Sequence, residues 1–300
     1  MRILVTNDDG VRAPGIAALA RVAAASGHDV VVVAPLVDYS GAGAAVGPVH
    51  SRDGIDYESH AIEGMEDVPS FGIDGPPALA VIVAAVGGFG PRPDLVLSGI
   101  NHGANVGRSA LHSGTVGAAL TAAHFGMRSL AVSVRWSDPP VPWETPAALA
   151  GALIPVLADA PEGTVLNLNV PDLPPGELRG VRHGRLGRSG TIRSAVHDTG
   201  APPDPTHPHV ALPPFTSGTL RLNLTPPGDD RDLALDTDAG LVANGFASLT
   251  PLVGVREADG AVVAPTLERS MEALGRLGPV GGVTTPAEAA AGGRPEAAAS

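Results

Sequence analysis

The first fifteen residues place two adjacent carboxylates directly after a short apolar run. Ile3–Val5 read as a β-strand, Asn7-Asp-Asp-Gly10 follows at its end, and Pro14 suits the first position of a helix. In an open α/β sheet, ligands bind beyond the carboxyl ends of the strands. Adjacent carboxylates there repel each other, and a hard divalent cation such as Mg²⁺ relieves the repulsion. Because Asp-Gly pairs are also common in turns, these residues alone leave a metal site and a capped turn equally open.

The chain that follows predicts a parallel α/β fold. Apolar spacing and Gly27 indicate a helix over 14–26, and Val30–Val33 is typical of a parallel strand buried on both faces. Strand, helix and strand within 35 residues form a right-handed βαβ unit. Residues 44–72 are expected to be irregular, with a short hairpin. Further helices are predicted over 76–86, 116–125, 145–159 and 267–277, and further strands over 94–98, 128–134, 164–170, 219–224 and 246–250.

Charge and composition exclude several classes of protein. With 31 acidic against 19 basic residues the net charge is −12, which argues against a protein that binds nucleic-acid polymers. The chain has no cysteine, so thiol nucleophiles and disulfides are excluded. Neither a membrane-length apolar run nor a leader sequence is visible. We therefore expect a cytoplasmic protein without membrane partners.

A glycine-rich stretch in mid-chain is the second candidate site. Glycines at 99, 103 and 107 give a flexible strand-exit loop that presents Asn101 and Asn105, and Ser113-Gly-Thr115 opens a helix. Hydroxyl and backbone N–H groups at a helix start bind anions readily. The spacing matches neither the P-loop nor the dinucleotide fingerprint. Taken by itself, the motif favours ordinary helix capping by Ser113 or Thr115 over an anion site.

The second half of the chain changes character after Pro171. A proline-rich segment, with histidines at 197, 207 and 209 too scattered for a zinc site, indicates an extended arm outside the sheet. Its arginines are better explained by a solvated surface or a subunit contact than by steering of an anionic substrate. These arginines are Arg179, Arg182, Arg185, Arg188 and Arg193. The expected divisions are a core at 1–181, an oligomerisation arm at 182–234, a returning segment at 235–278 and a disordered tail at 279–300.

Four motifs in register resemble the SurE family of survival-protein 5′-nucleotidases. They are Thr6–Gly10, the loop from Ala34 to Ala42, Ser98–Gly107 and Ser113–Ala119, followed by the weaker landmarks Leu166–Pro171, Arg185–Arg188, Thr237–Asp238 and Leu249–Leu252. The resemblance extends from residue 1 to about residue 253. It implies a Rossmann-like three-layer core with a mostly parallel sheet, and a protruding arm that builds homodimers or homotetramers. The implied activity is metal-dependent hydrolysis of nucleoside monophosphates, with 3′-nucleotidase and exopolyphosphatase activity as possible extensions.

The resemblance also assigns site residues by position. It favours the anion-binding interpretation of Ser113 and Thr115 over capping, and it makes Asp8, Asp9 and Asn101 the expected catalytic residues. One divalent ion, Mg²⁺ or Mn²⁺, would be held by Asp8, Asp9, Ser40 and Asn101. The phosphate would lie near Asn7, Gly41, Asn105, Ser113, Gly114 and Thr115.

Some features depart from the family pattern or leave alternatives open. His112 stands where the family usually has an aromatic residue, and Gly75–Leu79 replaces the usual Gly-Thr-Pro-Ala-Asp. Either His102 or His112 could act as the general acid. The alternative function is a non-hydrolytic nucleotide-binding or glycosyltransferase-like protein. A second nucleotide-binding half would support that alternative, and residues 180–300 do not supply one.

Overall fold

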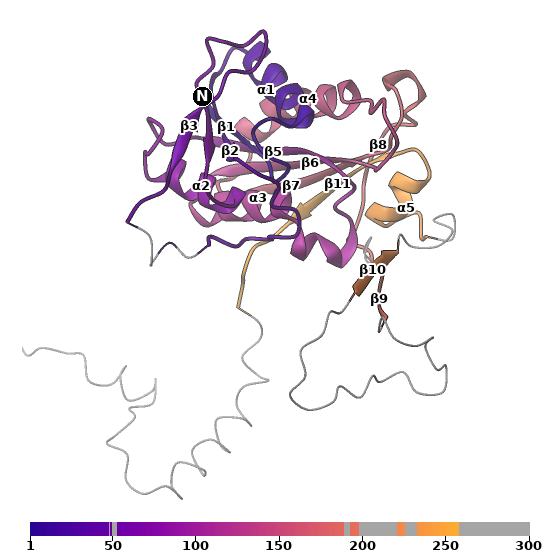
Figure 1. Cartoon of the computed structure of the whole chain (residues 1–300). Coiled ribbons are helices and arrows are strands. Elements are labelled where there is room, and N and C mark those ends of the chain that lie inside the picture. The colour runs from indigo at the N-terminus through magenta and orange to yellow at the C-terminus, as the bar shows by residue number, and fades with distance from the viewer. Residues whose placement is uncertain (48, 50–52, 189–192, 198–220, 226–232, 258–300) are drawn as a thin grey trace, which may run out of the picture. The chain divides into compact units, whose positions relative to one another are not determined.

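A nine-stranded, mostly parallel sheet organises the chain (Figure 1). The computed structural model describes residues 1–47, 49, 53–188, 193–197, 221–225 and 233–257. The strands are β1 (Arg2–Thr6), β2 (Asp29–Pro35), β3 (Tyr57–Ser59), β4 (Ser70–Ile73), β5 (Leu95–His102), β6 (Arg128–Val134), β7 (Val165–Val170), β8 (Val181–His183), β9 (Arg193–His197), β10 (Arg221–Thr225) and β11 (Ala247–Leu252). The helices are α1 (Pro14–Ala25), α2 (Pro77–Ala85), η2 (Gly107–His112), α3 (Gly114–His124), α4 (Glu144–Ala158), η3 (Pro175–Glu177) and α5 (Asp238–Ala243).

The order of the strands identifies the edge of the sheet where a ligand would bind. Across the sheet the order is β3-β4-β2-β1-β5-β6-β7-β11-β8. The six strands from β4 to β7 are parallel, while β3 and β11 pair antiparallel with β4 and β7. From β1 the chain first proceeds outward through β2 and β4, and it then returns to place β5 on the other side of β1. The loops after β1 and β5 therefore meet at a topological switch point, where open α/β sheets bind ligands.

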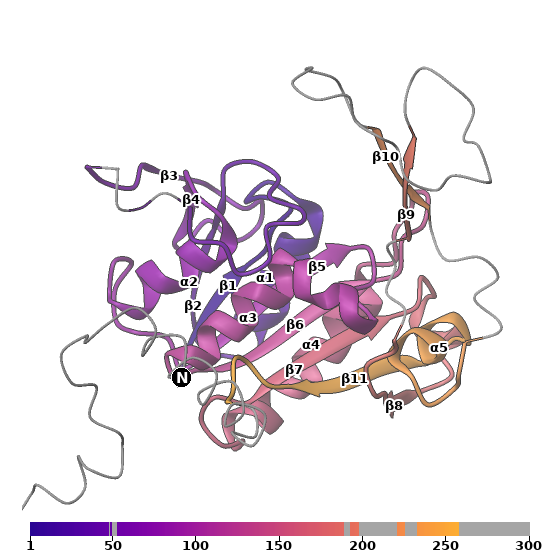
Figure 2. The ribbon, with the colours of Figure 1, turned by 90° about the horizontal axis from the view of Figure 1, so that it is seen from below.

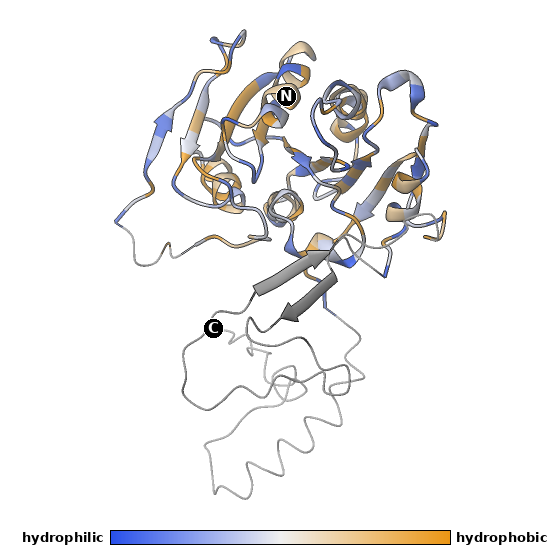
Figure 3. Cartoon of the chain, turned by 45° about the vertical axis from the view of Figure 1, so that its right-hand side comes forward, coloured by the Kyte–Doolittle hydropathy of each residue, from blue (hydrophilic) through white to orange (hydrophobic). Residues whose placement is uncertain are grey.

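Helices cover both faces of the sheet and complete the expected three layers (Figure 2). On one face, α1 and α4 pack through residues such as Ile16, Leu19 and Ile154 against Ile3 and Val5. On the opposite face, α2 and α3 pack against the alternate side chains of the same strands. Figure 3 shows that hydrophobic residues concentrate in the strands and in the helices that cover them. Strands buried on both sides account for the continuous apolar runs in the sequence.

The predicted elements agree with the structure, with some differences at their ends. β5 continues to His102 through a register irregularity between Ser98 and Asn101, so it is longer than the predicted strand at 94–98. The helix predicted to begin at Val116 begins at Gly114. The structure also contains η2 and α5, which the sequence patterns do not predict. The predicted helix at 267–277 and the tail at 279–300 lie outside the described residues.

The sheet extends slightly into the segment that was expected to form the arm. β8 pairs in parallel with β11, which carries the sheet to His183. Within the arm, β9 and β10 form an antiparallel pair, with Arg193 opposite Thr225. In the described part of the chain, no helix has the length and apolar character needed to cross a membrane.

Three of the arginines near the start of the arm already have structural partners. Arg179 and Arg182 lie over the ring of Phe246, with guanidinium carbons 4.6 and 3.7 Å from its centroid. Arg185 forms an ion pair with Asp236, with Nε 2.7 Å from a carboxylate oxygen. These contacts attach β8 and the chain after it to the end of the core. They support the structural explanation of these arginines over substrate steering.

Candidate active site

A cavity of about 200 Å³ lies where the loops after β1, β2 and β5 meet the start of α3. Six residues that the sequence assigned to metal or phosphate line it, together with both candidate histidines. The lining residues are Asp8, Ser40, Gly41, Asn101, His102, Gly103, Ala104, Asn105, Ser109, His112 and Ser113. Asp9, Asn7, Gly114 and Thr115 are not among the residues that line the cavity.

The Asp8 carboxyl group is fixed against the first turn of α3. The hydroxyl of Thr115 donates to Asp8 Oδ1 at 2.6 Å, and both side chains are buried. Gly114 allows this approach, because a Cβ atom there would lie 2.7 Å from Asp8 Cβ. Burial raises the pKa of Asp8, while the side-chain and backbone hydrogen bonds from Thr115 oppose that rise. The N-terminus of α3 thus holds a protein carboxylate at the edge of the cavity.

Three carboxylates share this region, and this crowding perturbs Asp9. Burial, followed by the negative charges of Asp8 and Asp38, raises the pKa of Asp9 to about 7. A hydrogen bond from the backbone N–H of His102 partly offsets the rise. The sequence pattern does not single out Asp38, although it lies two residues before Ser40. Without a cation, the carboxyl of Asp9 is poorly compensated at neutral pH.

Two neutral oxygen donors face the same cavity from different loops. The hydroxyl of Ser40 donates to Asp38 at 2.7 Å, which leaves its oxygen lone pairs free to bind a cation. The amide nitrogen of Asn101 donates to the Gly103 carbonyl at 2.6 Å, which leaves its side-chain oxygen as an acceptor. Two carboxylates, an amide oxygen and a hydroxyl form a hard donor set of the kind that binds Mg²⁺ or Mn²⁺.

The glycine-rich loop is pinned by residues that sequence reasoning did not select. Asn167 and Asn169 of β7 donate to the Asn105 carbonyl at 2.9 and 3.2 Å, and Asn169 also accepts the Asn105 backbone N–H. The Asn105 side chain donates to Ser133 of β6. Leu166–Pro171 is one of the landmarks of the family resemblance, but nothing in its pattern indicates that its amides support the site.

Asp238 fixes the far end of the same loop. Its buried carboxylate accepts backbone N–H groups from Gly107 at 2.7 Å, Gly187 at 2.9 Å and Ala239 at 2.8 Å. Charge-assisted bonds of this kind are stronger than neutral ones. The cavity therefore depends on a residue from the last part of the core.

Two predicted phosphate residues form local structural bonds. Asn7 is fully buried, and its amide closes the turn by bonding both the carbonyl and the N–H of Gly10. Ser113 caps α3, because its oxygen accepts the Val116 N–H at 3.1 Å. Since the Ser113 hydroxyl keeps its own proton, it can cap the helix and also donate to an anion in the cavity.

The two candidate histidines differ in their surroundings. The Nε2 atom of His102 lies 3.0 Å from the carbonyl oxygen of Ser137. Its ring also stacks on Trp136. His112 is exposed at the end of η2 and lines the cavity. His112 is therefore the better placed of the two to exchange a proton with solvent and with a ligand.

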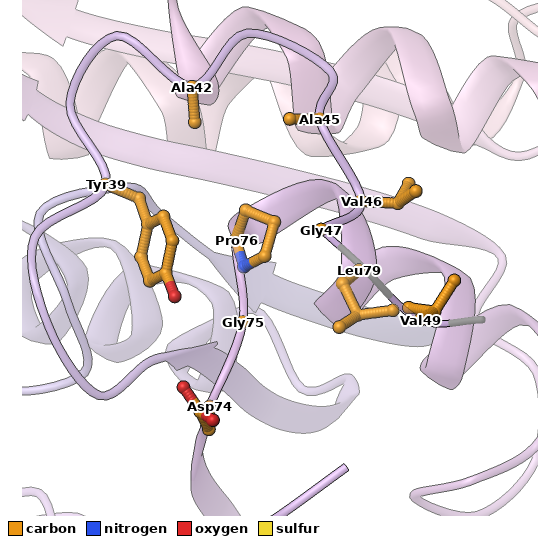
Figure 4. Close-up of a pocket in the computed structure, with 10 residues that line it drawn as sticks. All are labelled: Tyr39, Ala42, Ala45, Val46, Gly47, Val49, Asp74, Gly75, Pro76 and Leu79. Carbon is orange, nitrogen blue, oxygen red and sulfur yellow. The ribbon is translucent and has the colours of Figure 1, made fainter. Parts of the chain in front are cut away.

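A second, apolar pocket of about 140 Å³ adjoins the loop that carries Ser40 (Figure 4). Tyr39, Pro76, Leu79 and several small aliphatic residues form it. The described residues contain no group of three or more His, Asp, Glu or Cys side chains that could hold a metal ion together. The candidate cation site therefore rests on two carboxylates and two neutral oxygens.

The raised pKa of Asp9 predicts how pH affects the stability of the metal-free protein. Unfolding returns the carboxyl to its ordinary pKa near 4. The native state therefore binds the proton more tightly, and its stability falls as pH rises from about 4 to about 7. Asp9→Asn should remove this penalty, which is on the order of a few kcal/mol. In EDTA, the melting temperature of the variant should equal that of wild type near pH 4 and exceed it at pH 8. If the melting temperatures of the two proteins were equal both at pH 4 and at pH 8, the raised pKa of Asp9 would be contradicted.

Comparison of the amino-acid sequence with known proteins places this chain in one family. The family described as "Survival protein SurE" matches residues 3–192. The 5′/3′-nucleotidase SurE of Edwardsiella ictaluri is 37% identical over 257 residues, covering 84% of this chain and 89% of the relative. The protein of Aeromonas hydrophila, named 5′-nucleotidase SurE, is 35% identical over 254 residues, covering 84% of this chain and 92% of that relative.

A solved structure has the same fold. The SurE protein of Aquifex aeolicus superposes with a TM-score of 0.68 at 28% identity, covering 89% of this chain and all of that chain. Because it covers 89% of this chain, the structural similarity extends beyond the residues 3–192 that the family matches.

Proposed function

The chain belongs to the SurE family, and we propose that it is a phosphoric monoester hydrolase that converts nucleoside monophosphates to nucleoside and phosphate with one divalent cation. One observation carries the proposal. Asp8, held at the start of α3, shares a single cavity with Ser40, Asn101 and Ser113. A carboxylate and two neutral oxygen donors thus share the cavity with the hydroxyl at the start of α3, and this arrangement supports a cation and a phosphate group bound side by side.

Asp8, Asp9, Ser40 and Asn101 would hold the cation, Mg²⁺ or Mn²⁺. The raised pKa values of both carboxyls support this, because a positive charge would relieve their desolvation and mutual repulsion. Once bound, the ion would neutralise phosphoryl oxygens and lower the pKa of an attacking water. Thr115 keeps Asp8 in place by donating to Oδ1, and Gly103 orients the Asn101 amide.

The remaining cavity residues would bind the phosphate and assist the leaving group. The Ser113 hydroxyl and the positive end of the α3 dipole stabilise the phosphoryl oxygens as negative charge develops. Gly41 and Asn105 complete the wall around the phosphate, and Asn105 is held rigidly by β6 and β7. His112 is our candidate for protonating the leaving oxygen, because it is exposed and lines the cavity. Asn7 contributes by holding the turn that presents Asp8 and Asp9.

The assembly is part of the same proposal. We place the protein in the cytoplasm as a homodimer or homotetramer, with the arm at 182–234 between subunits. A proline-rich segment of this length is long for a loop of a compact domain. Among the described residues, β9 and β10 pair only with each other, so a strand of another chain could add to this two-stranded sheet.

Hydrolysis of AMP and of p-nitrophenyl phosphate, with and without Mg²⁺ or Mn²⁺, tests the function. We expect activity that is lost in EDTA and restored by metal. Ser113→Ala should raise KM about 10-fold by removing a donor to the phosphate, and should leave metal affinity unchanged. It should also lower stability by about 1 kcal/mol through loss of the cap. Tight nucleotide binding without hydrolysis under either metal would support the non-hydrolytic alternative instead.

A further inference from the structure

Both tryptophans of this chain contact one residue of the cavity wall, His102. The ring of Trp136 stacks on the imidazole, with centroids 4.1 Å apart and planes inclined by 17°. Trp143 meets the same imidazole edge-on, at 5.7 Å and 66°. Aromatic residues make up only 3% of the chain, and it has two tryptophans. Both tryptophans therefore lie beside the candidate site.

The aromatic group is fixed in place from both sides. The His102 Nε2 atom lies 3.0 Å from the Ser137 carbonyl oxygen, in the loop that follows β6. Trp143, at the start of α4, packs against the hydrophobic core. The backbone of His102 follows Asn101 directly, so the imidazole belongs to the same loop as a proposed cation ligand. The His102 ring lines the cavity and covers one face of the Trp136 ring, because the two rings are stacked.

Trp136 itself is 66% exposed. A large aromatic ring left in water forgoes the free energy of burial, which a bound apolar group would recover. Stacking on an aromatic face suits every nucleobase, because each has a π-face. The leaving group of the proposed reaction carries such a base, whereas the phosphate end carries only charge.

On the basis of the proposed function, we propose that Trp136, supported by His102, is a stacking platform for the base of the nucleotide whose phosphate lies in the cavity. The platform sets a preference for phosphate esters whose leaving group carries an aromatic base. It does not take part in the cleavage of the P–O bond. Its loss therefore affects the binding of nucleotides, but not the hydrolysis of esters that have no aromatic ring.

Steady-state kinetics with matched substrates test the platform. In Trp136→Ala, KM for AMP should rise about 10-fold while kcat changes little, and KM for ribose 5-phosphate should stay at the wild-type value. Trp136→Phe should restore most of the AMP affinity. Val86→Ala, at a residue that is 72% exposed at the end of α2, is the control and should behave as wild type.

Fluorescence gives a second readout that does not need turnover. In Trp143→Phe, Trp136 is the only tryptophan, so adenosine should quench its emission and ribose 5-phosphate should not. An unchanged KM for AMP in Trp136→Ala would overturn the proposal. An equal rise in KM for AMP and for ribose 5-phosphate would also overturn it, because it would mean that Trp136 only positions His102. An adenine base in the apolar pocket beside Tyr39 would also leave Trp136 emission unchanged and refute the platform. If wild type hydrolyses none of these esters, the proposed function fails, and the quenching experiment still decides whether a base stacks on Trp136.

Discussion

Asp9→Asn is expected to lower metal affinity and kcat together, each by about 10²-fold or more, because it removes one of the charges that hold the cation. The amide keeps the shape of the side chain, and the fold should not suffer. In EDTA the variant should be more stable than wild type at neutral pH, since burial and two neighbouring carboxylates raise the Asp9 pKa to about 7. The combination of weaker metal binding with a more stable metal-free protein is specific to a cation ligand.

Metal titration calorimetry, turnover of AMP and thermal melting measure the three quantities on the same preparation. Asp67→Asn makes the same chemical change at an exposed position and should match wild type in all three. An Asp9→Asn enzyme with full activity, or wild-type hydrolysis that needs no metal, would refute the proposed mechanism.

Gly114→Ala should lower both stability and kcat, although alanine normally favours a helix more than glycine does. Its Cβ atom would lie 2.7 Å from Asp8 Cβ and 2.8 Å from Asp8 Oδ2, so the carboxyl or the helix has to move. We expect unfolding to become easier by about 1–3 kcal/mol. We also expect kcat to fall by about 10- to 100-fold, because small displacements of catalytic groups are costly.

The matched control is Gly176→Ala in η3. An added Cβ atom there meets no atom within 4 Å, so activity and melting temperature should be unchanged. Wild-type values for Gly114→Ala would show that α3 does not need to approach Asp8 closely. Reduced stability with normal kcat would separate the packing role of Gly114 from its role in the site.

Most of the core and part of the site follow from sequence patterns. The valines of β2 and the small-residue helix α3 were predictable because buried parallel strands and close helix packing restrict residue types. The proximity of Asp8, Ser40, Asn101 and Ser113 was predictable because parallel strands end at the same edge of the sheet.

Other features depend on contacts that a linear pattern does not contain. The sequence suggested that Thr115 binds phosphate, but in the structure its hydroxyl donates to Asp8. Asp38 and Asn169 lie inside motifs of the family resemblance, but the motifs do not indicate that one perturbs Asp9 and the other holds Asn105. Their roles arise from positions in three dimensions that only the assembled sheet defines.

The position of β11 has a consequence for the order in which the protein matures on the ribosome. β11 lies between β7 and β8, so the nine-stranded sheet is incomplete until residue 252 has been synthesised. Gly107 likewise waits for Asp238, its partner 131 residues later. Domains generally fold as units during synthesis. The nascent chain can therefore form the central parallel strands early, but it completes the walls of its cavity only after nearly the whole core has emerged.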